Sequence, residues 1–213
     1  MTWISYLVPQ QIARFSSPYN RDIRVMEESG RLKLLVNGSR QSGKYVDEIW
    51  LQALEGLGIY KLTRVSRILV LGVAGGTIIS MLSKCFLTSK IVGVDIDPEM
   101  IGIGKKYFGL DEISNLTIIE GDAKFFVHQA KTKHWHYKLV VVDVYKGNEI
   151  PAFVIQHTFL QNLKSILGPH ASIVFNYSPD DKEKVHVFER TLAHIYSSVL
   201  HKTIDRHDFF LAR

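Results

Sequence analysis

The sequence predicts an α/β fold built on an open, mostly parallel sheet. The first observation is a pair of continuous apolar runs, Ile68–Leu71 and Ile91–Val94, the pattern of strands that helices cover on both faces. The second is the glycine-rich turn Gly72–Gly76 between them, followed by an apolar segment of helical length. With 213 residues, 46% of them hydrophobic, the chain is long enough to bury one substantial core.

Ahead of this unit, the sequence predicts a small β flap. Two short apolar runs, residues 23–27 and 32–36, flank a turn at Ser29-Gly30. We therefore divide the chain into a β-hairpin flap of residues 1–46 and a core of residues 47–213. An isolated hairpin is only marginally stable, so we expect the flap to pack on the core or on a second subunit of a homodimer.

Helices and further strands are predicted to alternate along the core. Asp47 is expected to cap a helix that extends to Tyr60. Gly168-Pro169 is expected to end a helix that begins at Pro151. The remaining predicted elements are helices at residues 98–108, 124–129 and 180–200 and strands at residues 115–120, 139–143, 171–177, 202–205 and 209–212.

A carboxylate that follows the second apolar run points to a nucleoside site. Asp95 lies 23 residues after Gly72, close to the spacing of about 20 at which an acid hydrogen-bonds ribose hydroxyls in a βαβ nucleotide-binding unit. A dinucleotide fingerprint would require glycine at position 74, where this chain has Ala74. We therefore predict an adenosine compound with a short chain rather than a pyrophosphate. A turn that holds no ligand is the alternative.

Four motifs, in the expected order, resemble the spermidine synthase (polyamine aminopropyltransferase) family of class I S-adenosylmethionine-dependent methyltransferases. They are GVAGG at 72–76, GVDID at 93–97, EGDA at 120–123 and VVVDVYKG at 140–147, within a likeness that runs from about Ile23 to about Tyr177. The resemblance implies a Rossmann-like sheet of about seven strands and an N-terminal β flap over the active site. It also implies S-adenosylmethionine or decarboxylated S-adenosylmethionine as the donor.

The resemblance assigns residues to this donor. Asp122 matches an acid that accepts a hydrogen bond from the adenine amino group, and Gln41 matches a glutamine that contacts the nucleoside. Capping of the next helix is a second role open to Asp122, and a solvated turn is the alternative for Gln41. The expected donor-binding residues are Gln41, Gly72, Gly75, Gly76, Asp95, Ile96, Asp122 and Ala123.

Asp143 and Tyr145 are the candidate catalytic residues. The apolar run 139–142 leads to Asp143, and ligands of open α/β sheets bind outside the carboxyl ends of the strands. Transfer from a sulfonium is an in-line displacement, for which the protein needs mainly to align the acceptor and remove its proton. The matching aspartate of the family accepts a hydrogen bond from the acceptor amine. Capping of the following turn is the alternative for Asp143.

Three departures from the family pattern concern the polyamine half of the site. Lys146 stands where the family has a second acid that holds the polyamine, and a lysine there repels a diammonium substrate. Ala74 replaces an aspartate that lies toward the aminopropyl end of the donor, and Trp50-Leu51 is the nearest match to a Tyr-Gln pair. We therefore expect methyl transfer to a small-molecule acceptor, an amine being one candidate, with aminopropyl transfer as the alternative. A non-catalytic nucleoside-binding or dimerisation module is the second alternative.

The composition of the chain limits which partners and which cellular compartment we expect. The formal charge of +5 is dispersed along the chain, so we expect no nucleic-acid binding. The apolar runs are far shorter than the ~20 residues that cross a bilayer, and the N-terminus lacks a secretory leader pattern, so we expect no membrane association. The single Cys85 excludes an internal disulfide and indicates a cytoplasmic protein. His134 and His136 have no further ligands at coordinating spacing, so no metal site is expected.

Overall fold

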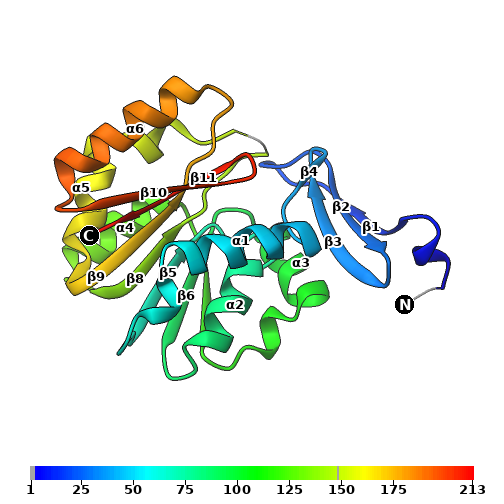
Figure 1. Ribbon diagram of the computed structural model, residues 1–213. Coiled ribbons are helices and arrows are strands. Elements are labelled where there is room, and N and C mark those ends of the chain that lie inside the picture. The colour runs from blue at the N-terminus through cyan, green and yellow to red at the C-terminus, as the bar shows by residue number, and fades with distance from the viewer. Residues whose placement is uncertain (1–2, 148) are drawn as a thin grey trace.

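The computed structural model describes residues 3–147 and 149–213 and contains a large sheet and a small one (Figure 1). The strands of the large sheet are β5 (Arg67–Leu71), β6 (Lys90–Asp95), β7 (Leu116–Glu120), β8 (Tyr137–Val142), β9 (Leu167–Asn176), β10 (Val199–Ile204) and β11 (His207–Ala212). Within the described residues, these seven strands lie in the order β10-β11-β9-β8-β5-β6-β7. Strands β5 to β9 pair in parallel, whereas β11 is antiparallel to both of its neighbours. The predicted α/β fold with a mostly parallel sheet is confirmed.

Helices cover both faces of the large sheet (Figure 1). They are α1 (Lys44–Gly56), α2 (Thr77–Cys85), α3 (Pro98–Phe108), α4 (Ala123–Thr132), α5 (His157–Ser165) and α6 (Lys182–Ile195). Successive residues of β5 pack on opposite faces, Ile68 and Val70 with α1 and α2, and Leu69 and Leu71 with α4, α5 and α6. This two-sided burial explains the continuous apolar run in the sequence. No helix among the described residues is both long and apolar enough to cross a membrane.

The small sheet forms the flap. Its antiparallel strands are β1 (Gln10–Phe15), β2 (Ile23–Glu28), β3 (Arg31–Val36) and β4 (Ser39–Arg40). The predicted hairpin is β2 and β3, and its inner side chains pack on Met100 and Ile103 of α3, as expected for a flap that rests on the core. Strand β1 was not predicted, because this mostly exposed strand carries no clear apolar period and has an irregular register between Gln11 and Ala13.

The start of α1 corrects the predicted helix at residues 47–60. Gly43, with a φ of 106°, precedes the first helical residue, so Asp47 lies inside the first turn and is not the N-cap. Its carboxylate instead accepts a hydrogen bond from the hydroxyl of Thr77, 3.3 Å away. The predicted division between residues 46 and 47 therefore falls within α1, and the separation into flap and core stays a prediction.

The segment after Pro151 also differs from the prediction. A 3-10 turn (Ala152–Ile155) and α5 replace one helix, because Gln156 between them is extended, with a ψ of 131°. Gly168 and Pro169 do not end a helix but lie in β9, at a point where its pairing with β8 shifts register. The last predicted helix is likewise shorter, since α6 ends at Ile195 and residue 199 already begins β10.

Candidate active site

A cavity of about 280 Å³ lies between the flap and the carboxyl ends of β5, β6 and β8. This is the edge of an open α/β sheet at which ligands bind. Tyr19, Asn20 and Val36 line the cavity from the flap. Eight of the predicted site residues line it as well, namely Gln41, Gly72, Asp95, Ile96, Asp122, Ala123, Asp143 and Tyr145.

The glycine turn serves packing inside the protein. Gly72 has a φ of 89°, and a side chain there would collide with the carbonyl oxygen of Asp143, so glycine lets the ends of β5 and β8 approach closely. A Cβ on Gly75 would lie 2.7 Å from the Cβ of Ser42, and one on Gly76 would collide with Leu110. Neither Gly75 nor Gly76 lines the cavity. Glycine is therefore required at these two positions by packing, and not by the approach of a ligand as predicted from the sequence.

Asp95 is held by the backbone of two neighbouring segments. Its Oδ2 accepts hydrogen bonds from the backbone N–H groups of Val73 at 2.8 Å and Ala74 at 3.2 Å, and its Oδ1 accepts one from Asp97 at 3.0 Å. Burial raises the pKa of Asp95, and these three hydrogen bonds oppose the rise. A carboxylate has about four lone-pair sites, so the oriented group can still accept from a ligand in the cavity.

Asp122 and Asp143 occupy the ends of two other segments at the cavity. Asp122 caps α4, accepting from the backbone N–H groups of Lys124 at 2.7 Å and Phe125 at 3.2 Å, so the predicted capping role is confirmed. Asp143 directly follows β8, and its Oδ1 accepts a hydrogen bond of 2.9 Å from the side-chain amide of Asn176. Burial raises the pKa of Asp143 to about 6, while the bond from Asn176 opposes this rise.

Tyr145 points back toward the end of β9. Its hydroxyl donates to the carbonyl oxygen and to the side-chain oxygen of Asn176, at 3.4 and 3.3 Å. Burial and the nearby carboxylate of Asp143 raise the pKa of the Tyr145 hydroxyl, so this residue stays protonated at neutral pH. Asn176, which contacts both candidate catalytic residues, was not identified from the sequence. Its position at the carboxyl end of a predicted strand was the available signal.

The flap wall of the cavity is tied to the core by a buried carboxylate. Asp97 accepts hydrogen bonds at one oxygen from the hydroxyl of Ser17 at 2.5 Å and the side-chain amide of Asn20 at 2.8 Å. Its other oxygen caps α3 by accepting from the backbone of Glu99 at 3.0 Å. Tyr19 and Asn20 were not predicted to line the cavity, because they lie on a connection without regular structure.

Acidic side chains outnumber basic ones in the lining of the cavity. Lys146 lines the cavity and is exposed, and the four other charged residues that line it are aspartates. Trp50 is buried and packs edge-on against Phe209, with ring centroids 4.9 Å apart, so it does not border the cavity. Among residues 3–147 and 149–213, no three or more His, Cys, Asp or Glu side chains gather where they could hold a metal ion.

The known proteins that this chain resembles include an aminopropyltransferase and a methyltransferase. A polyamine aminopropyltransferase of Vibrio vulnificus is 30% identical over 110 residues, which cover 52% of this chain and 37% of the relative. An eEF1A lysine and N-terminal methyltransferase homolog of Drosophila pseudoobscura is 28% identical over 115 residues, 51% of this chain and 17% of the relative. The chain thus spans less than half the length of these two relatives.

Structural comparison and a family model agree with the fold. The crystal structure of a probable spermidine synthase from Corynebacterium glutamicum has a TM-score of 0.80 at 14% identity, covering 94% of this chain and 79% of that one. At this identity the likeness establishes the fold alone. The model of the spermine/spermidine synthase domain matches residues 49–197, more than half of the chain. The chain therefore belongs to the spermine/spermidine synthase domain family.

Proposed function

We propose that this protein is a group transferase that binds S-adenosylmethionine in the cavity and transfers its methyl group to a small acceptor. The observation that carries the proposal is the convergence of Asp95, Asp122 and Asp143 on one cavity at the carboxyl ends of the central strands. Family membership supports a sulfonium-dependent transferase, and the relatives include both an aminopropyltransferase and a methyltransferase.

The residues of the cavity suit the nucleoside half of such a donor. Asp95 is fixed by three backbone donors, and its remaining lone pairs would accept hydrogen bonds from the ribose hydroxyls. Asp122 and Ala123, at the start of α4, would meet the adenine ring and its amino group. Gln41 would hold the nucleoside from the flap side, where its amide donates to the carbonyl oxygen of Gly147 at 3.4 Å.

Asp143 would act on the acceptor. When bound, S-adenosylmethionine supplies a methyl group already activated by the positive sulfur. Asp143 would accept a hydrogen bond from the acceptor atom and take up its proton. The acceptor atom would form a bond to the methyl carbon as the bond from that carbon to sulfur breaks, and the sulfur would keep the electron pair. Because burial raises the pKa of Asp143 to about 6, this carboxylate is a stronger base than an exposed aspartate and is still ionised at neutral pH. Tyr145 would form part of the acceptor wall.

Lys146 favours methyl transfer over aminopropyl transfer. The lysine adds a positive charge where the aminopropyltransferase pattern has an acid, and Ala74 removes another acid near the chain of the donor. Aminopropyl transfer from decarboxylated S-adenosylmethionine stays as the second candidate, supported by the relative from Vibrio vulnificus. A non-catalytic module that binds a nucleoside is the third candidate function.

Calorimetric titration with S-adenosylmethionine, its decarboxylated form and methylthioadenosine tests the proposal, followed by a turnover assay on a panel of amines. We expect S-adenosylmethionine to bind and to be consumed. Asp95→Ala should weaken binding by roughly 10- to 100-fold, whereas Glu120→Ala, an exposed acid at the end of the adjacent strand, should leave it unchanged. Binding of the decarboxylated donor alone would reverse the ranking, and binding without turnover would favour the module.

The exposed apolar residues of the flap suggest a second subunit. Tyr6, Leu7, Val8 and Ile12 are exposed on or just before β1, the edge strand of the small sheet. Covering such a surface is a common reason for dimerisation. We propose a homodimer through this edge, to be tested by light scattering. Ile12→Lys should produce the monomeric mass, and a monomeric wild-type protein would contradict this proposal.

A further inference from the structure

We propose that Asn176 is a positioning residue for Asp143, and that Ser178 fixes the orientation of its side-chain amide. The catalytic meaning of this inference rests on the function proposed above, but the orientation itself does not. Asn176 does not line the cavity, so it is not a ligand contact. Its action would pass through the carboxylate of Asp143, to which its Nδ2 donates at 2.9 Å.

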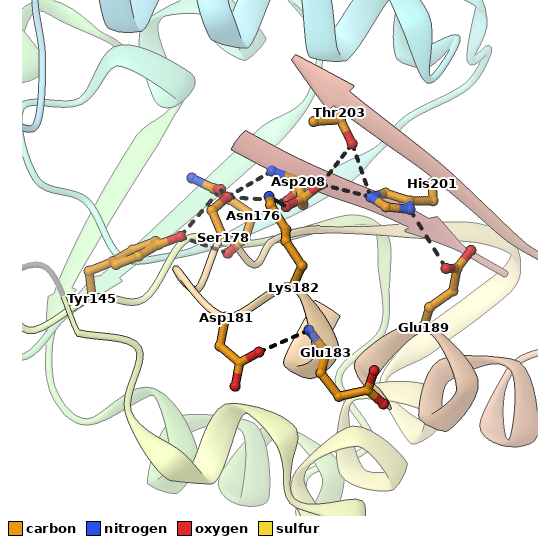
Figure 2. A network of polar contacts seen from close by, with 10 residues as sticks. All are labelled: Tyr145, Asn176, Ser178, Asp181, Lys182, Glu183, Glu189, His201, Thr203 and Asp208. Atoms are coloured by element: carbon orange, nitrogen blue, oxygen red, sulfur yellow. Dashed lines mark hydrogen bonds and ion pairs between the residues drawn. The ribbon is translucent and has the colours of Figure 1, made fainter. Parts of the chain in front are cut away.

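Asn176 and Asp143 come together because of strand register. β8 and β9 pair in parallel with Val142 opposite Phe175, so the residues that follow these two lie side by side. Figure 2 shows the other end of the Asn176 amide, where Tyr145 and Ser178 both approach it. The hydroxyl of Ser178 donates to the Oδ1 of Asn176 at 2.9 Å. The Asn176 amide therefore has acceptors on one side and donors on the other.

The hydrogen-bond partners of Ser178 and of Asp143 together indicate which way the Asn176 amide faces. A serine hydroxyl carries one proton, and the Ser178 oxygen already accepts a bond of 2.8 Å from the backbone N–H of Asp208. Its own proton has two acceptors in reach, the Oδ1 of Asn176 at 2.9 Å and the carbonyl oxygen of Asp208 at 3.5 Å, and the shorter contact is the one to Asn176. The opposite amide orientation would place the Asn176 oxygen against the ionised carboxylate of Asp143, two acceptors without a proton between them.

Ser178 is itself anchored by Asp208, a buried carboxylate of the C-terminal hairpin that side chains of the hairpin and of α6 contact (Figure 2). The Asp208 carboxylate accepts from Lys182 at 2.7 Å, from Thr203 at 2.7 Å and from His201 at 3.0 Å. Burial acts to raise the pKa of Asp208, but these three bonds hold it below its ordinary value. The Asp208 carboxylate therefore stays ionised, and the backbone N–H of Asp208 donates to Ser178.

The hydrogen bond from the Asn176 side chain matters for catalysis because it affects the charge state of Asp143. A donor to the carboxylate favours the ionised form, which is the form that can take a proton from an acceptor. Removing the donor should raise the pKa of Asp143 above its value of about 6 and reduce the ionised fraction at neutral pH. The titratable and charged side chains that share the cavity with Asp143 are Tyr19, Asp95, Asp97, Asp122, Tyr145 and Lys146.

A carbon-detected NMR titration of the Asp143 carboxyl tests this in the complete chain without any need for turnover. We expect Asn176→Ala to raise the midpoint by roughly one to two pH units, the equivalent of one hydrogen bond to a charged group. Ser178→Ala should shift it in the same direction by less, because Tyr145 still donates to the amide oxygen, and Ser178→Thr, which keeps the hydroxyl, should restore it. Ser83→Ala, which removes a half-buried hydroxyl in α2, is the matched control and should have no effect.

The pH profile of methyl transfer then separates this inference from the proposed function. Asn176→Ala should move the rising limb of kcat to higher pH by the same amount as the NMR midpoint, with the affinity for the donor unchanged. An unmoved NMR midpoint in Asn176→Ala, or an equal shift in Ser178→Ala and Ser178→Thr, overturns the inference. If the midpoint moves but no variant and no wild-type protein turns over, the proposed function fails and the orientation of Asp143 by Asn176 stands. Should Asn176→Ala not fold, the two Ser178 variants decide the matter by themselves.

Discussion

The side-chain amide of Asn20 donates a 2.8 Å hydrogen bond to the carboxylate of Asp97, joining residues that are 77 positions apart. Both side chains are buried, Asn20 with 7% and Asp97 with 1% of its surface exposed. Asn20 belongs to the connection between β1 and β2, whereas Asp97 caps α3 in the core. A hydrogen bond to a buried charge is stronger than one between neutral groups, so this contact fixes the flap wall of the cavity.

Loss of this contact should loosen the flap. Asn20→Ala leaves the buried carboxylate of Asp97 with one side-chain donor fewer, and we expect a loss of about 1–2 kcal/mol in the free energy of unfolding. Relative to wild type, the hydrogen-exchange rates of the β2 amides should rise more than those of the β5 amides. Arg14→Ala, which removes an exposed ion pair with Asp22, is the control and should change stability little. Equal exchange rates in Asn20→Ala and wild type would show that packing on α3 holds the flap without this bond.

Gly72→Ala should be strongly destabilising. The new methyl group would collide with the Asp143 carbonyl, and the φ of 89° is strained for alanine, so we expect a cost of at least about 2 kcal/mol in urea unfolding. Gly102→Ala is the matched control, since a Cβ there meets no atom within 4 Å. Gly102 lies in an exposed turn of α3, where alanine should stabilise by roughly 0.5–1 kcal/mol. Similar stability in both variants would contradict the close approach of β5 and β8.

Stability should depend on pH through Asp143. Its pKa is about 6 in the fold, above the ordinary 3.8, so the folded protein binds this proton more tightly than the unfolded chain. The protonated Asp143 therefore stabilises the fold at low pH, and this stabilisation is lost as the pH rises through about 6. The total loss in the free energy of unfolding is at most about 3 kcal/mol. Asp143→Asn has no such titration. Relative to wild type, its free energy of unfolding should increase between about pH 4 and pH 8, and parallel curves would refute this.

Lys146 should control the charge of the accepted amine. Lys146→Asp reverses the charge at the cavity mouth, and we expect a short diamine to bind roughly five- to tenfold more tightly at low salt. Lys146→Ala should give a smaller gain, because it removes repulsion without adding attraction. Lys105→Asp, a change on α3 at a lysine that does not line the cavity, is the control for net charge. Unchanged diamine affinity in Lys146→Asp would mean that the lysine does not face the acceptor.

Much of the site was predictable because the sheet places strand ends together. Asp95 and Asp143 each stand at the end of an apolar run, and parallel strands carry their carboxyl ends to one edge. Asp122 was predictable from its place before a helix. The reason for Gly75 and Gly76 was not, since it depends on side chains of Ser42 and Leu110 that lie far away in the sequence.

The sequence by itself determined the order of the strands of the large sheet along the chain, the central βαβ unit and the acids at its strand ends, because burial leaves a periodic trace along the chain. Only the tertiary structure decided that Asn20 reaches Asp97 and that Asn176 reaches Asp143, across 77 and 33 positions. Such polar contacts follow from how the flap sits on α3 and how β9 aligns with β8. Hydrogen bonds between distant residues depend on packing geometry, which no local pattern of residue types encodes.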